Sequence, residues 1–275
     1  MSGLERMQGE TGAFERVEGD ARSGLLLLCD HASNAIPAEY GNLGLGDSAL
    51  QRHIAYDIGA ARVTRRIAER LGAPALLTTY SRLLIDPNRG EDDPTLVMRY
   101  SDGATVPGNA RVDDAEIARR VALHWRPYRE AIRAQIAQMT AAHRAPAVLS
   151  IHSFTPVWRG APRSWKLGVL WDSDPRLPRA LLDGFAGLGL APEEIGDNAP
   201  YDGALVGDTI DDCATPLGLS NALLELRQDL IGTAEGAREW ADKVADVLAA
   251  PLGDPAVVAP ADFGARTGTK VIAAP

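Results

Sequence analysis

The chain has 275 residues, of which 45% are hydrophobic and 24% charged, a composition typical of a soluble globular protein. Its 37 Asp and Glu residues outnumber 28 Lys and Arg residues, and the resulting net charge of −9 disfavours nucleic-acid binding. The polar segment Met1–Ser23 does not resemble a signal peptide, and the apolar run Leu25–Cys29 is far too short to span a bilayer. Two cysteines exclude a disulfide framework. We therefore expect a cytoplasmic protein with reduced thiols and no membrane partner.

Apolar runs alternate with helical patterns along the first half of the chain. In chain order, these patterns predict a strand at Leu25–Asp30, a helix at Asp47–Leu71, and strands at Ala75–Thr79 and Leu83–Asp86. Gly72 follows the last periodic position and predicts the end of the helix. A long polar loop, 88–108, comes next.

The second half of the chain continues the alternation. It predicts a helix at Asp113–His143, strands at Ala147–His152 and Leu167–Trp171, a helix at Leu177–Phe185, a strand at Ala222–Arg227 and a helix at Ala234–Ala249. Asp113 is the expected cap of the long helix, with Glu116 at the capping-box position, and Pro127 predicts a kink. Such alternation favours one α/β domain over residues 24–250, with a largely parallel sheet covered on both faces. Residues 1–23 form a loose lead-in and residues 251–275 a tail.

Two histidines end predicted strands. His31 follows the strand Leu25–Asp30, and His152 ends the strand Ala147–His152. Because ligands bind at the carboxyl ends of parallel strands, two imidazoles at neighbouring strand ends would form a metal site. The alternative is that each histidine is a half-buried, hydrogen-bonded residue.

His53 and Asp57 are candidates for a third metal ligand, and they lie one turn apart on the predicted helix. Asp57 would complete a His/His/carboxylate set, which suits catalytic zinc with an open position. His53 is the other candidate, and a pair on the helix surface without metal is the third possibility. His124 and His143 lie on the long helix and are expected to be structural.

Charged residues also occur in and around two apolar segments. Glu225 and Arg227 share one face of the predicted strand Ala222–Arg227, which favours either a general base beside a metal or a structural ion pair. Arg82 precedes the strand Leu83–Asp86, and Asn88 and Arg89 follow it. A guanidinium at a strand end suits carboxylate binding, the alternative being a solvated surface charge.

Five segments together resemble the N-formylglutamate amidohydrolase family over roughly residues 24–250. They are DHASNAIP (30–37), HIAYDIGA (53–60), SRLLIDPNR (81–89), SIHSF (150–154) and LLELRQDLI (223–231). The resemblance implies a three-layer α/β/α sandwich with a mostly parallel, mixed sheet, similar to zinc-dependent exopeptidases. It also implies hydrolysis of an N-acyl amide, most simply N-formyl-L-glutamate, to the free amino acid and formate, with one Zn²⁺ per chain.

The resemblance assigns roles to individual residues. Zinc would be held by His31, His152 and Asp57; Glu225 would be the general base, and Arg82 would help to stabilise the oxyanion. The residues expected to bind the small-molecule substrate are Asn88, Arg89, Arg227, Ser33 and Asn34.

One position departs from the pattern. Related zinc carboxypeptidases carry Glu where this chain has Asn34, which leaves the third metal ligand open among Asp57, His53 and Asn34. Two alternative functions follow. The chain could hydrolyse another N-acyl amino acid or a short peptide in the manner of a zinc carboxypeptidase, or it could be a non-catalytic carboxylate-binding module.

Overall fold

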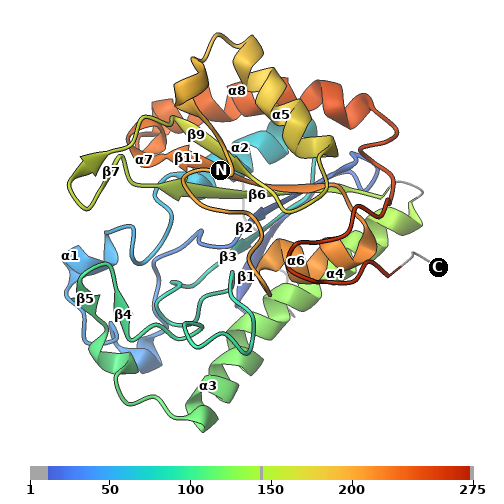
Figure 1. Ribbon diagram of the computed structural model, residues 1–275. Coiled ribbons are helices and arrows are strands. Elements are labelled where there is room, and N and C mark those ends of the chain that lie inside the picture. The colour runs from blue at the N-terminus through green and yellow to red at the C-terminus, as the bar shows by residue number, and fades with distance from the viewer. Residues whose placement is uncertain (1–11, 143–144, 273–275) are drawn as a thin grey trace, which may run out of the picture.

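A seven-stranded mixed sheet forms the centre of the computed structural model, which describes residues 12–142 and 145–272 (Figure 1). The strand order is β1-β3-β2-β6-β11-β9-β10. The strands are β1 (Phe14–Val17), β2 (Leu25–Cys29), β3 (Ala75–Thr78), β6 (Ala147–Phe154), β9 (Leu167–Leu170), β10 (Ile195–Asp197) and β11 (Asn221–Arg227). Neighbours pair in parallel except β1 with β3 and β11 with β9, which are antiparallel.

Helices cover both faces of this sheet. On one face lie α2 (Ala60–Leu71), α5 (Arg176–Gly187) and α8 (Ala234–Gly253), and on the other α4 (Arg126–Ala141) and α6 (Thr209–Cys213) (Figure 1). The predicted three-layer α/β/α sandwich with a mostly parallel, mixed sheet is therefore confirmed.

Shorter helices are α1 (Asp47–Leu50), α3 (Asp114–Arg120) and α7 (Gln228–Ile231), and 3₁₀ turns occupy Ala38–Tyr40, Pro107–Asn109, Pro192–Glu194 and Thr215–Leu217. Two small hairpins pair β4 (Tyr100–Ser101) with β5 (Ala104–Thr105) and β7 (Val157–Trp158) with β8 (Ala161–Pro162).

The all-apolar strand β2 explains why the sheet is buried on both faces. Because side chains alternate along a strand, Leu25 and Leu27 pack in the layer of α2 and α8. Leu26 and Leu28 pack in the layer of α4 instead. A run of apolar residues without alternation is thus the expected signature of a central parallel strand.

Two predicted elements are wrong. The expected helix Asp47–Leu71 is interrupted between α1 and α2, where the Asp57 N–H donates to the His31 carbonyl at 2.9 Å and Gly59 adopts φ +89°. The segment Leu83–Asp86 is a buried turn, because its N–H groups bond locally or to the Leu96 carbonyl. Apolar character alone therefore did not distinguish a strand from a buried turn.

The long helix is confirmed through α3 and α4, and its N-terminus carries the expected cap, since the Asp113 side chain accepts from the Glu116 N–H at 2.9 Å. A π-helical turn, Val121–Trp125, lies directly before Pro127, at the position where a kink was predicted. His143, the predicted end of this helix, lies outside the described residues.

Both ends of the chain add structure that the sequence patterns did not indicate. Strand β1, within the expected lead-in, pairs with β3 along its whole length. In the expected tail, α8 continues to Gly253, and Arg266 forms ion pairs with Asp172 and Asp202. Among the described helices, each is too short or too polar to cross a lipid bilayer.

Gly59 tests how tightly the start of α2 is packed. A Cβ atom there would lie 2.3 Å from the Ile231 carbonyl oxygen, in a left-handed backbone conformation. We expect Gly59→Ala to lower the free energy of unfolding by about 2–4 kcal/mol, because a steric clash adds to backbone strain. The control Gly72→Ala also has positive φ but open space, and should cost about 1 kcal/mol. Denaturant unfolding measures both, and equal losses would contradict the packing argument.

Candidate active site

Two histidines meet at the carboxyl edge of the central strands. His31 lies two residues after the end of β2, and His152 lies in β6, the parallel neighbour of β2. Their ring centroids are 4.9 Å apart, and both rings are buried. The sequence-based expectation that these imidazoles lie close together is therefore confirmed.

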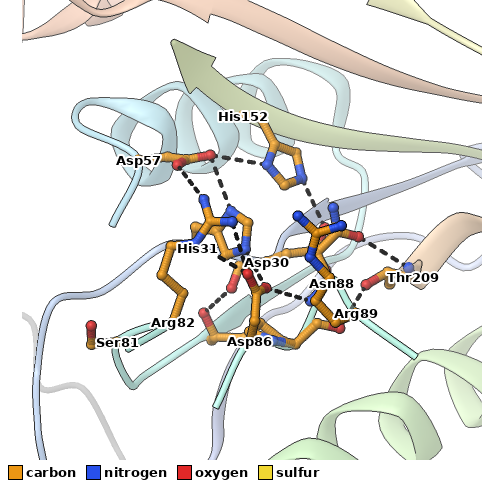
Figure 2. Close-up of polar contacts among 12 residues, drawn as sticks. Asp30, His31, Asp57, Ser81, Arg82, Asp86, Asn88, Arg89, His152 and Thr209 are labelled. Atoms are coloured by element: carbon orange, nitrogen blue, oxygen red, sulfur yellow. Dashed lines mark hydrogen bonds and ion pairs between the residues drawn. The ribbon is translucent and has the colours of Figure 1, made fainter. Parts of the chain in front are cut away.

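The Asp57 carboxylate, from the connection between α1 and α2, lies between the two rings. Its Oδ2 atom is 3.4 Å from His31 Nδ1 and 2.9 Å from His152 Nδ1 (Figure 2). Burial alone would raise the pKa of Asp57, but the two imidazoles hold it well below its usual range. Because Asp57 is on a turn and not on a helix, the expected helical pair with His53 does not exist.

A second carboxylate contacts the far side of each ring. His31 Nε2 lies 2.7 Å from Asp86 Oδ1, and His152 Nε2 lies 2.9 Å from Asp30 Oδ2 (Figure 2). With the N–H on Nε2, donated to Asp86 and to Asp30, both rings can present their Nδ1 lone pairs to a metal ion beside Asp57. Metal-binding histidines are oriented in this way.

Asp30 is completely buried and held by further donors. The Ser150 hydroxyl donates to it at 2.6 Å and the Tyr128 hydroxyl at 3.1 Å. Burial raises the pKa of Asp30, but the hydrogen bond and charge of His152 outweigh this effect and bring the pKa to about 2. Asp30 therefore stays ionised and fixes the orientation of His152.

The three residues His31, Asp57 and His152 fit a metal ion. Their ligand atoms all lie within 4.8 Å of one another. Tetrahedral zinc with ligands at ~2.1 Å separates ligand atoms by about 3.4 Å, close to the distances from Asp57 to the two rings. Three protein ligands leave a fourth position open, as in catalytic zinc sites.

Glu225 faces this group from the adjacent strand β11, where it is in register with His152. Its Oε2 atom is buried and has no hydrogen-bond partner among the described residues. Burial, together with the negative charge of Asp57, raises the pKa of Glu225 to about 7. The alternative of a Glu225–Arg227 ion pair is not observed, because Arg227 binds Asp229 at 2.8 Å.

The predicted anion-binding residues take different positions. Arg82 lines the cavity but donates to Asp86 at 2.8 and 3.2 Å. Asn88 accepts from the Thr209 N–H at 3.0 Å. The Arg89 guanidinium forms no ion pair within the described part of the chain, and Figure 2 shows it directed toward His152.

Three other predicted substrate residues do not line the cavity. The Asn34 amide donates to the Leu50 carbonyl at 2.8 Å, and Ser33 accepts from the Ala35 N–H at 3.1 Å. Arg227 donates to Asp229 and to the Arg163 carbonyl. Each of the three side chains therefore binds another part of the protein and not the space inside the cavity.

His53 and His124 are not part of the metal-binding group. His53 lines the cavity and pairs with Asp102 at 3.0 Å. The His124 ring packs 5.2 Å from the Tyr80 ring, as expected for a structural histidine.

Sequence reasoning missed Asp30 and Asp86 as the partners of His152 and His31. A charged residue at the end of an all-apolar strand was a signal for Asp30.

A cavity of about 470 Å³ opens above the metal-binding group. Besides His31, Asp57 and His152, its walls include Arg82, Arg89 and Glu225. The arrangement therefore places a candidate metal site, an unpartnered carboxylate and a free guanidinium around one space. Such a set can hydrolyse an amide bond whose substrate carries a carboxylate.

Comparisons with known proteins agree with this geometry. The family model N-formylglutamate amidohydrolase matches residues 23–232. A solved gene product of Agrobacterium tumefaciens is 35% identical, covering 89% of this chain and 95% of its own, with a TM-score of 0.82. The N-formylglutamate amidohydrolase of Ralstonia eutropha shares the fold at 19% identity, covering 90% and 98%, with a TM-score of 0.63. No curated protein matches. The chain belongs to the N-formylglutamate amidohydrolase family.

Proposed function

We propose that this protein hydrolyses the N-formyl amide of an N-formyl amino acid, releasing formate and the free amino acid. N-formyl-L-glutamate is the reference substrate because the family model is named for it. The observation that carries the proposal is the buried group His31–Asp57–His152 with Glu225 facing it across one cavity.

His31 and His152 would hold the metal through their Nδ1 atoms, and Asp57 through its carboxylate. One zinc ion per chain is expected. When bound, zinc supplies a Lewis acid that polarises the acyl carbonyl and makes water acidic enough to attack near neutral pH. Asp30 and Asp86 would keep the two imidazoles oriented while substrate binds.

Glu225 would act as general base and then as general acid. Its Oε2 atom, unpartnered in the described residues, is available to accept a proton from the attacking water. A pKa near 7 suits this task, because the carboxylate can both take up and release a proton at neutral pH. The same oxygen would then give the proton to the leaving amine.

Two arginines would bind the substrate carboxylate and stabilise the oxyanion. Arg89, with Asn88 beside it, would hold the substrate carboxylate and so position the amide bond. Arg82 would add positive charge near the carbonyl oxygen as it becomes an oxyanion, while remaining bound to Asp86.

Removing only the ionisable oxygen of Glu225 tests the general base. We expect Glu225→Gln to lower kcat on N-formyl-L-glutamate by about 10²–10⁴-fold, because proton transfer is lost. Its zinc content should match the wild type. The exposed substitution Glu235→Gln is the matched control. Turnover near the wild-type rate in Glu225→Gln would rule out this mechanism.

Elemental analysis tests the ligand set. We expect about one zinc per chain in the wild type, and its loss in His152→Ala and in Asp57→Ala. His53→Ala should keep the metal, because His53 pairs with Asp102 instead. Retention of zinc in Asp57→Ala with loss in His53→Ala would reverse the assignment of the third ligand. A protein that takes up no zinc would favour a carboxylate-binding module.

Asp30→Asn tests the orientation of His152. An amide cannot accept the imidazole N–H with the same strength, so we expect zinc affinity to fall about 10–100-fold. Competition with a chromophoric chelator measures the affinity. The exposed Asp20→Asn serves as control, and equal affinity in both variants would show that Asp30 does not support the ligand.

A further inference from the structure

Among the residues that the structure describes, the cavity offers a substrate one arginine without an ion pair. Arg82 and Arg89 are the arginines among its described lining residues, and no described lysine lines it. Arg82 is bound to Asp86 through two nitrogens. Of these two arginines, Arg89 is left for a substrate carboxylate. A second substrate carboxylate would lose water without gaining a second unpaired Arg or Lys among the described lining residues, which is costly.

The acidic residues around the rim add to this cost. Asp102 and Asp202 line the cavity. Asp102 is already paired with Arg52 and His53, and Asp202 with Arg266. As ionised carboxylates they only accept hydrogen bonds, so neither can bind a second substrate carboxylate. The cavity is therefore unfavourable for the side-chain carboxylate of glutamate.

Part of the cavity wall is instead aromatic. Phe154 follows His152 on β6, Trp158 lies on the β7–β8 hairpin, and Tyr201 lies in the loop after β10. We call these three residues the aromatic wall. Further apolar side chains line the same cavity, namely Met98, Leu170, Leu205 and Leu223.

Arg163 holds the aromatic wall in place. Its guanidinium lies 5.5 Å from the Phe154 ring centroid and 5.3 Å from those of Trp158 and Tyr201. It also donates to the Thr155 carbonyl and the Tyr201 hydroxyl, each at 3.3 Å. Arg163 does not itself line the cavity. Its positive charge interacts with all three rings and holds them in position, so the aromatic wall is formed before substrate binds.

We infer that this enzyme prefers N-formyl amino acids with one carboxylate and a large apolar side chain over N-formylglutamate. The inference rests on the proposed deformylase function. Arg89 binds the α-carboxylate, and the side chain packs against the aromatic wall. The volume of about 470 Å³ lies in the range that encloses drug-sized ligands, which leaves room for such a side chain.

Initial rates of the zinc-loaded wild type test the preference. We expect kcat/KM for N-formyl-L-leucine and N-formyl-L-phenylalanine to exceed that for N-formyl-L-glutamate by at least about tenfold. N-formyl-L-glutamine, which has nearly the same shape without the charge, should also exceed glutamate. A preference for N-formyl-L-glutamate over the glutamine compound would overturn the inference and leave the deformylase function standing.

Substitution of Trp158 locates the subsite. Trp158→Ala should lower kcat/KM for the phenylalanine compound about tenfold or more, with N-formylglycine changed less than about twofold because it has no side chain. Trp165→Ala, which does not alter the cavity lining, is the matched control. Equal losses on both substrates would overturn the assignment. A wild-type preference for N-formyl-L-glutamate that disappears in Arg163→Met would also overturn the assignment. That result would mean that Arg163 binds the second carboxylate.

Calorimetric titration separates this inference from the proposed function. If no N-formyl amino acid is hydrolysed, the deformylase function fails. Binding of N-formyl-L-phenylalanine and N-formyl-L-glutamate to the same protein still decides the preference. Tighter binding of the phenylalanine compound supports the aromatic wall as its site, and tighter binding of the glutamate compound overturns it.

Discussion

The Asp57 carboxylate between two buried imidazoles is the interaction on which the site depends. A buried charge is strongly unfavourable unless it is paired, and Asp57 is paired with His31, His152 and the N–H of Ser153. Its own backbone N–H is bonded to the His31 carbonyl, so the turn and the histidine fix each other. This mutual fixation explains why the chain leaves the helical conformation between α1 and α2.

Two further carboxylates turn this pairing into an oriented ligand set. Asp30 and Asp86 accept from the outer nitrogens of the rings, and each has additional donors of its own. The parallel strands β2, β6 and β11 supply the rigid frame, because they bring Asp30, His152 and Glu225 to one edge. Adjacent strands thus fix one half of the site, and the turns that carry Asp57 and Asp86 are bonded to it.

Loops from distant parts of the chain supply further parts of the cavity wall, where we propose that selectivity arises. Arg89 comes from the segment after the buried turn, Trp158 from a hairpin, and Tyr201 from the loop after β10. Arg266, close to the C-terminus, binds Asp202 beside Tyr201 and so ties the last segment to the cavity wall. The catalytic group and the walls around it can therefore change independently, which is how one fold serves different substrates.

The sequence by itself determined the α/β class, the central strands and the residues at their ends. Hydrophobic periodicity is local, and a polar residue that ends or interrupts an apolar strand is visible without a structure, as with His31, His152 and Glu225. Only the tertiary structure decided which of these groups meet. It moved Asp57 from a helix to a turn and placed Asn34 and Arg227 outside the cavity. Contacts between residues far apart in sequence, such as Asp30 with His152, have no local signature because they arise from strand register.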